Sequence, residues 1–172
     1  GSGDTSNAWA MLLVFLALAV IGTAVWTAID RRRRAHPRLA ALALIGLRYY
    51  LGSTLISYGL AKLSQFPAPG PMRLDEQVGE LSPMGMLWAF MGSSTPYSLF
   101  AGAVEVLGGV LLLWRRTAVL GALVGAAAMT NVFVLNLTYD VPVKLFSFVL
   151  LAMAVVIALP QARRLMTAVL GG

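Results

Sequence analysis

Five long apolar stretches dominate this chain, and they constrain its fold more than any other feature. A helix needs roughly 20 apolar residues to cross a hydrocarbon core of about 30 Å. Four of the stretches are readily recognised, whereas the second carries charges within it. They cover residues 8–29, 38–63, 95–114, 117–137 and 142–159. Because 59% of the 172 residues are hydrophobic, the sequence predicts an all-α integral membrane protein with five spans.

The first stretch, residues 8–29, is expected to remain in the membrane as an anchor, because it is too long for a signal-peptide core and its arginines follow it. Residues 64–94 contain no span. Their prolines favour an extended path in QFPAPGPMR. In SPMGMLWAFMG, Ser82 and Pro83 are suited to the N-cap and first position of a short helix. We expect residues 64–94 to form an outer loop whose short helix lies in the interface or covers the bundle as a lid.

Most arginines fall on one side of the predicted spans and most acidic residues on the other, together with Arg73 and the span ends that bear Lys62 and Lys144. Arginines 31–34, 38, 115, 116, 163 and 164 lie on one side, and the acids at 4, 75, 76, 80 and 140 lie on the other. Because Lys and Arg in short loops stay in the cytoplasm, we expect the N terminus outside and the C terminus inside. This topology explains most of the net charge of +6, and the basic residues need no partner beyond anionic lipid head groups. We therefore expect membrane lipids, and no nucleic acid, as partners.

The ligands that redox metals need are scarce in this chain. It has no cysteine, and its single histidine, His36, lies in the predicted cytoplasmic loop. Haem, copper, zinc and iron–sulfur sites depend on these residue types. The sequence therefore predicts no metal site and no intrinsic cofactor.

Two cations share one face of the second span. Helical residues advance by about 100°, so Arg48, Gly52, Leu55, Gly59 and Lys62 form a single stripe. A charge inside a bilayer costs at least about 2.5 kcal/mol on insertion scales. We expect this stripe to face the bundle as a glycine-floored groove with a cation at each end.

Glu105, on the third span, is the predicted partner of Arg48. Each lies ten residues outward from an arginine at the predicted inner boundary, Arg115 and Arg38, so equal depth makes an ion pair plausible. Two roles stay open for the pair: a lock between two helices, or proton handling and ligand binding.

A second polar cluster is expected at the outer end, beneath the predicted lid. Lys62 is its principal charged group, and Ser147 lies beneath it. Its other members are Tyr58, Gln65, Asn131, Asn136, Tyr139, Asp140 and Lys144. The alternative is a set of snorkelling lysines around a capped helix turn. We favour a ligand site, because so many hydrogen-bonding types converge there.

Gly121 and Gly125 form a small-xxx-small face on the fourth span. Such faces let helix backbones approach closely in membranes. We expect helix packing there, in preference to a direct ligand role.

The segments YGLAKL and EVLGGVLLL, with RR closing the second of these helices, resemble the DoxX family of small bacterial membrane proteins. The matching positions are Tyr58, Gly59, Lys62, Glu105, Gly108, Gly109 and Leu111. The resemblance covers roughly residues 40–160 and implies a four-helix transmembrane bundle in a bacterial cytoplasmic membrane. We accordingly divide the chain into an N-terminal transmembrane anchor with a basic loop, residues 1–37, and a four-helix membrane domain, residues 38–172, that carries the outer loop at 64–94.

The resemblance also implies a redox setting, since the family takes its name from subunits of a terminal quinol oxidase and of a thiosulfate:quinone oxidoreductase. In one hypothesis a quinone enters the groove, Tyr58 and Lys62 bind its oxygens, and Glu105 with Arg48 handles a proton. Electron transfer then needs partner subunits with redox cofactors. In the other, the chain is a non-catalytic subunit that anchors a larger membrane complex. A transporter ranks third, because no inverted repeat is evident. Catalysis itself is left open.

Overall fold

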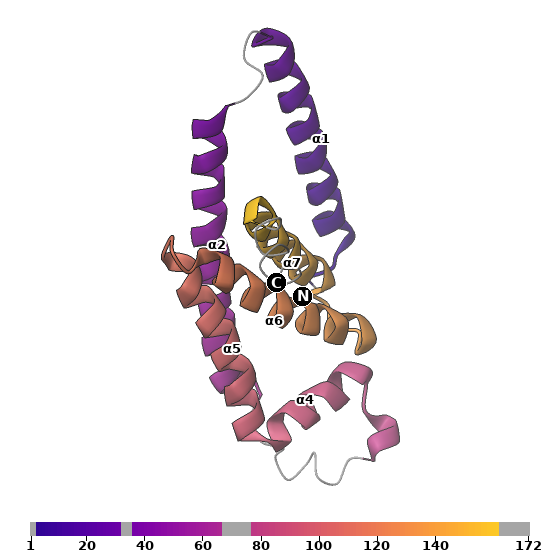
Figure 1. Cartoon of the computed structure of the whole chain (residues 1–172). Helices are drawn as coiled ribbons and strands as arrows, with labels where there is room; N and C mark the ends of the chain where they lie inside the picture. Colours follow the sequence, from indigo (N-terminus) through magenta and orange to yellow (C-terminus); the bar gives the residue numbers. More distant parts are fainter. Residues whose placement is uncertain (1–2, 32–35, 67–76, 162–172) are drawn as a thin grey trace, which may run out of the picture.

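The computed structural model describes residues 3–31, 36–66 and 77–161, without the side chains of Leu63, Gln65 and Val78, and its regular elements there are all helices (Figure 1). Five helices are long and apolar enough to cross a membrane. They are α1 (Ser6–Ile29), α2 (Pro37–Gln65), α5 (Thr95–Leu113), α6 (Ala118–Thr138) and α7 (Lys144–Ala158). The predicted all-α membrane fold is therefore confirmed. The proline-rich part of the 64–94 segment, most of the basic loop, and Arg163 and Arg164 lie outside the described residues.

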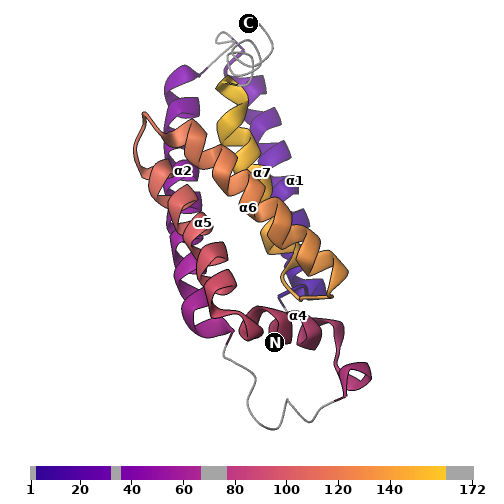
Figure 2. The ribbon, with the colours of Figure 1, turned by 60° about the horizontal axis from the view of Figure 1, so that its bottom comes forward.

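Helices α2, α5, α6 and α7 form the bundle. Helix α2 packs on α5, α5 on α6 and α6 on α7, and α7 returns to α2 (Figure 2). Large apolar side chains from all four helices fill the interior. Those that are completely buried are Leu51, Leu55, Leu112, Met129 and Leu150.

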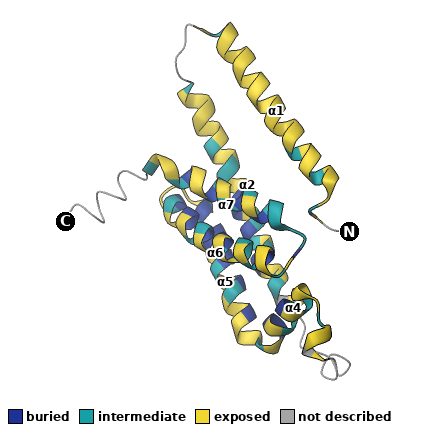
Figure 3. Cartoon of the chain, turned by 90° about the vertical axis from the view of Figure 1, so that its right-hand side faces the viewer, coloured by how far each residue is buried: buried dark blue, intermediate teal, exposed yellow. Residues whose placement is uncertain are grey.

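Helix α1 stands outside this bundle, as Figure 3 shows, and none of its residues is buried. A polar contact joins the N-terminal end of α1 to the start of α7. The Asp4 carboxylate accepts hydrogen bonds from the backbone N–H groups of Lys144 (2.8 Å) and Leu145 (3.0 Å). These are free donors at the N-terminus of α7, where a carboxylate also suits the helix dipole. Asp4 thus caps a helix far away in the sequence. The division into units 1–37 and 38–172 stays a prediction.

Glycines set the register of α2 against α5. A Cβ on Gly102 would meet the carbonyl oxygen of Gly59 at 2.5 Å, and one on Gly109 would meet that of Gly52 at 2.6 Å. The two antiparallel backbones are therefore in direct contact at two levels. Gly121 and Gly125 form a similar contact between α6 and α5, where a Cβ on Gly121 would meet the Leu112 nitrogen at 2.6 Å. The predicted packing face is confirmed.

The two ends of the bundle differ in height. We call the end with the α5–α6 turn (residues 114–117) the arginine end, and the end with α4 (Pro83–Ser93) the lid end. The glycine register places Arg48 beside the α5–α6 turn. Residues 37–47 of α2 therefore continue about 16 Å beyond that turn at the helical rise, and α1 runs alongside them (Figure 1). The arginine end is consequently stepped, with a tall α1–α2 side and a short α5–α6 side.

The lid end carries the short helix that the sequence predicts. Helix α4 begins at Pro83, and the Ser82 side chain accepts a hydrogen bond from the Gly85 backbone N–H at 3.0 Å. The predicted N-cap is confirmed. At the other end of α4, the hydroxyl of Ser98 donates to the carbonyl of Met91 at 2.8 Å. A short 3₁₀ helix, η1 (Val78–Glu80), precedes α4.

Candidate functional site at the lid end

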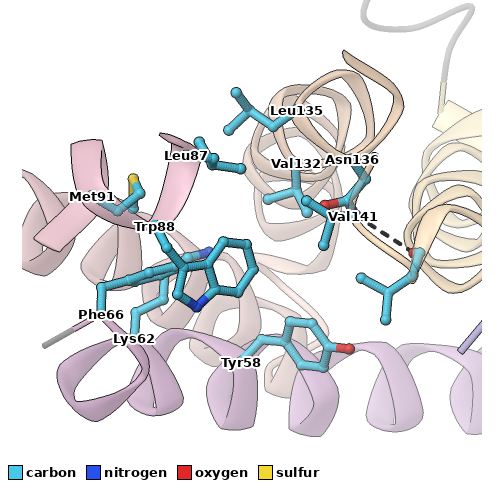
Figure 4. A pocket seen from close by; sticks show the side chains of 11 residues that line it. Tyr58, Lys62, Phe66, Leu87, Trp88, Met91, Val132, Leu135, Asn136 and Val141 are labelled. Carbon is cyan, nitrogen blue, oxygen red and sulfur yellow. Dashed lines mark hydrogen bonds between the residues drawn. The ribbon is translucent and has the colours of Figure 1, made fainter. Parts of the chain in front are cut away.

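A small cavity lies between α2, α4 and α6 at the lid end (Figure 4). Its volume is about 80 Å³. Three polar side chains border it, Tyr58 and Lys62 from α2 and Asn136 from α6, and apolar or aromatic side chains form the rest of the wall. The apolar and aromatic members are Phe66, Leu87, Trp88, Met91, Val132, Leu135, Val141 and Val143.

The principal charge at this cavity is Lys62, and its partner is Glu105. The Lys62 Nζ lies 2.5 Å from Glu105 Oε1, with side chains only 11% and 2% exposed. Close helix packing produces the pair: Gly102 has no side chain, and a Cβ built there would lie 3.4 Å from Lys62 Cβ. The lysine stem therefore passes over Gly102 to reach Glu105, which follows less than one turn later on α5.

Donors and acceptors remain available around this ion pair. An ammonium has three N–H donors, and among the described residues Lys62 makes one hydrogen bond, to Glu105. The other carboxylate oxygen, Glu105 Oε2, is buried and has no hydrogen-bond partner among the described residues. Because buried polar atoms are normally satisfied, a bound polar group or water is expected at this pair.

The prediction that Arg48 pairs with Glu105 is wrong. In the observed register Glu105 lies opposite Ile56, so Arg48 lies about 12 Å away along α2 at the helical rise. The error came from placing Arg38 and Arg115 at one depth, whereas α2 extends past the α5–α6 turn. Arg48 instead lies over the ring of Tyr49, 5.1 Å from its centroid.

The prediction that the glycine stripe on α2 forms a groove open to a ligand is also wrong. The backbone of α5 fills it, because Gly52 and Gly59 contact Gly109 and Gly102. The glycine stripe is a helix-packing face, and the space beside Lys62 comes from α4 and α6.

The remaining predicted cluster residues do not share one site. Asn136 is buried and borders the cavity, but its side chain also donates to Ser147 Oγ at 3.0 Å and so ties α6 to α7. It donates in addition to the Val143 carbonyl at 3.5 Å, the dashed line in Figure 4. Tyr139 packs half-buried against the apolar group around Leu87 and Val141. Asn131 is exposed on α6, away from the cavity, and Gln65 ends α2 with a side chain outside the described set.

Asp140 and Lys144 belong to a separate polar opening of about 490 Å³, next to Asp4 and the start of α4. The Lys144 Nζ lies 2.6 Å from Asp140 Oδ1 and 4.0 Å from Asp4 Oδ2. Asp140 is 81% exposed. The alternative of a capped turn with surface lysine pairing therefore describes this half of the cluster well.

Sequence reasoning missed several cavity residues. Leu87, Trp88 and Met91 come from α4, where helical spacing places them on one face. That spacing could have indicated a face turned toward the bundle. Asp4 gave no such signal, because the helix that it caps lies 140 residues later.

The chain shows clear similarity to known proteins across this region. A family model for DoxX matches residues 42–137. An uncharacterized protein of Bacillus subtilis (strain 168), YwoB, is 33% identical over 121 residues, which are 69% of this chain and 77% of the relative. The chain belongs to the DoxX family. No solved structure matches it.

The DoxX match includes the ion pair and most of the cavity. Lys62, Glu105 and Asn136 lie inside residues 42–137, whereas α1 and α7 lie outside. The region shared with DoxX proteins thus consists of most of α2 with α4, α5 and nearly all of α6.

Proposed function

We propose that this DoxX protein is a bacterial membrane subunit that binds a lipid-soluble quinone or quinol at the lid end, as part of a redox complex. The observation that carries this proposal is the Lys62–Glu105 pair, buried in the membrane domain at the wall of an aromatic-lined cavity. Intramembrane charges are costly and commonly mark functional sites. As a link between α2 and α5 alone, the ion pair would duplicate the two glycine contacts that already hold these helices together.

The residues present suit a flat ring with oxygen at its edge. Tyr58, Phe66 and Trp88 supply aromatic surface, and Lys62 has two N–H donors that no described residue uses and that can bind a ring oxygen. The buried Glu105 Oε2 is positioned to take the proton of a quinol O–H, and the neighbouring ammonium keeps the carboxylate ionised until it does so. A bound quinone would supply two-electron chemistry, for which a partner carrying haem, flavin or metal must exchange the electrons.

The size of the cavity adds a requirement. A cavity of about 150 Å³ holds benzene, and this one measures about 80 Å³. A ring therefore needs more room than the structure shows, and we propose that α4 moves outward to provide it. Outward movement of α4 would enlarge the cavity toward the membrane surface, where the tail of a quinone can stay in lipid.

Binding of menadione, a quinone without a tail, tests the proposal. In a variant with Trp88 as the single tryptophan (Trp9, Trp26 and Trp114 each changed to Phe), reconstituted in nanodiscs, we expect saturable quenching of Trp88 fluorescence. Lys62→Met combined with Glu105→Gln removes both charges and should weaken binding by about ten-fold or more, the equivalent of one charge-assisted hydrogen bond.

Lys144→Met is the matched control, because Lys144 lies at the same end but borders the other opening. It should bind menadione as the parent does. Equal binding by the Lys62/Glu105 variant and its parent, or no saturable quenching at all, would disprove a quinone site in this cavity.

The second candidate is a non-catalytic subunit that anchors a larger complex. Helix α1 favours it, because none of its 24 residues is buried within the chain and a partner could cover it. Purification in mild detergent separates the two candidates. A stable complex that keeps its oxidoreductase activity with the Lys62/Glu105 variant would favour anchoring alone.

A further inference from the structure

One nitrogen of the Arg48 guanidinium has no hydrogen-bond partner among the described residues. This nitrogen, Nε, is buried, and the guanidinium contacts the Tyr49 ring. The four ion pairs in the described chain all lie elsewhere, and none includes Arg48, Arg115 or Arg116. Because a cation this close to hydrocarbon is costly when unpaired, an anion from outside the chain is expected beside it.

Further cations lie at the same level. The register of Gly52 against Gly109 and Leu112 puts Arg48 beside the α5–α6 turn. Arg115 and Arg116 occupy that turn, and both are exposed. Three arginines thus lie at about the same level at the foot of the step on the arginine end, and no described carboxylate lies in the turn with them.

Exposed aromatic side chains mark this level as the depth of lipid head groups. Tyr49 is 49% exposed, Tyr50 51% and Trp114 60%. Tyrosine and tryptophan concentrate where hydrocarbon meets head groups. The α5–α6 turn also has backbone groups that hydrocarbon could not satisfy. The head-group surface must therefore dip at the short α5–α6 side, below the top of the tall α1–α2 side.

We propose that the foot of the step binds an anionic phospholipid, with its phosphate held by Arg48 together with Arg115 and Arg116. A guanidinium presents a planar fork of donors that matches phosphate oxygens. The acyl chains run from there toward the bilayer centre along exposed apolar side chains such as Leu107, which is 52% exposed. Basic recesses between transmembrane helices are recognised places for such lipids.

A phospholipid fits better than a carboxylate from a partner protein. Three cations without a described acid call for a ligand with several acceptor oxygens, and phosphate provides them. The aromatic level is also where lipid phosphates already lie. The site is independent of the lid-end cavity, which Arg48 does not border.

Native mass spectrometry of the full chain in detergent tests the proposal, with phosphatidylglycerol and phosphatidylcholine offered together. We expect the parent to retain phosphatidylglycerol preferentially, and Arg48→Met to reduce that preference by about ten-fold, the equivalent of one charge-assisted contact. Arg38→Met is the matched control: it removes an exposed arginine of the same helix, ten residues from Arg48, and should leave the preference unchanged.

In the lipid competition, three outcomes would overturn the proposal: equal preference in Arg48→Met and parent, equal losses in Arg48→Met and Arg38→Met, or no preference in the parent. No preference in the parent would point to a partner protein as the source of the anion. A separate binding experiment with glycerol 3-phosphate distinguishes a lipid from a soluble phosphate, and tight binding of it would be a fourth contradicting outcome. If Arg48→Met does not fold, the double variant Arg115→Met and Arg116→Met replaces it, with the same expected loss and the same overturning result.

Discussion

At the scale of single residues, the Lys62–Glu105 pair is the feature whose burial costs desolvation free energy for two charges at once. Both side chains leave water, and their attraction must offset two desolvation penalties. Within the part of the chain that the structure describes, only one carboxylate oxygen of Glu105 accepts a hydrogen bond, so the geometry there is not the fully satisfied one that makes a buried pair favourable. A role of the pair other than stability is therefore part of the proposed ligand site and stays a prediction.

This argument predicts unequal effects of single and double substitutions. Lys62→Met alone leaves the Glu105 carboxylate buried without its partner, and should cost about 3 to 5 kcal/mol of unfolding free energy. Lys62→Met with Glu105→Leu removes both charges, and should cost far less or nothing. Melting of the purified variants in one detergent measures the difference. A double variant as unstable as the sum of the two single variants would contradict the interpretation.

From the sequence, the two buried charges could be predicted, but not which residues pair. Lys62 and Glu105 could be recognised as inward-facing, because each is a charge inside an apolar stretch. The identity of Glu105's partner depended on how far α2 slides along α5, and the glycine contacts that fix this register are visible only in three dimensions. The error with Arg48 was therefore one of register and not of chemistry.

At the scale of the elements, the glycine contact between α2 and α5 controls the site. Gly59 and Gly102 bring the two backbones together at the level where Lys62 crosses α5. The helices themselves could be predicted from the apolar stretches and from Ser82 and Pro83. The cavity could not, because α4 and α6 approach α2 from distant parts of the sequence.

Two alanine substitutions on α2 should therefore have opposite effects. In Gly59→Ala the new Cβ meets the Gly102 carbonyl and Val106, so α5 must shift, and overpacking of this kind costs about 1 to 3 kcal/mol. A Cβ on Gly46 meets nothing within 4 Å, so Gly46→Ala should be neutral, or stabilising by about 0.5 to 1 kcal/mol through helix propensity. Detergent melts compare the two. Equal melting temperatures for the two variants would show that the contact does not control packing.

At the scale of the whole molecule, the arrangement is polarised. The lid end carries α4, the cavity and the Asp4 cap, whereas the arginine end carries Arg115 and Arg116 and the step between the two helix pairs. The five spans were predictable from the apolar stretches, and the four-helix bundle with α1 outside it from the resemblance to the DoxX family. The step was not predicted, because Arg38 and Arg115 were placed at one depth. It arises from the 29 residues of α2 lying beside the 19 of α5.

The polarity also predicts how the protein sits in the membrane, with the lid end outside and the arginine end in the cytoplasm. Arginines in the short α5–α6 turn resist translocation across the membrane, and five spans put the two termini on opposite sides.

Cysteine labelling tests this orientation. The chain has no cysteine, so a single introduced cysteine is the only thiol that can be labelled. A membrane-impermeant maleimide added to intact spheroplasts should label Gln77→Cys at once, but Arg116→Cys only after permeabilisation. Gly22→Cys, in the apolar part of α1, should stay unlabelled in both conditions, because a thiol in hydrocarbon does not ionise. Labelling of Arg116→Cys in intact spheroplasts together with protection of Gln77→Cys would show the opposite orientation, and the anionic lipid proposed at the arginine end would then belong to the outer leaflet.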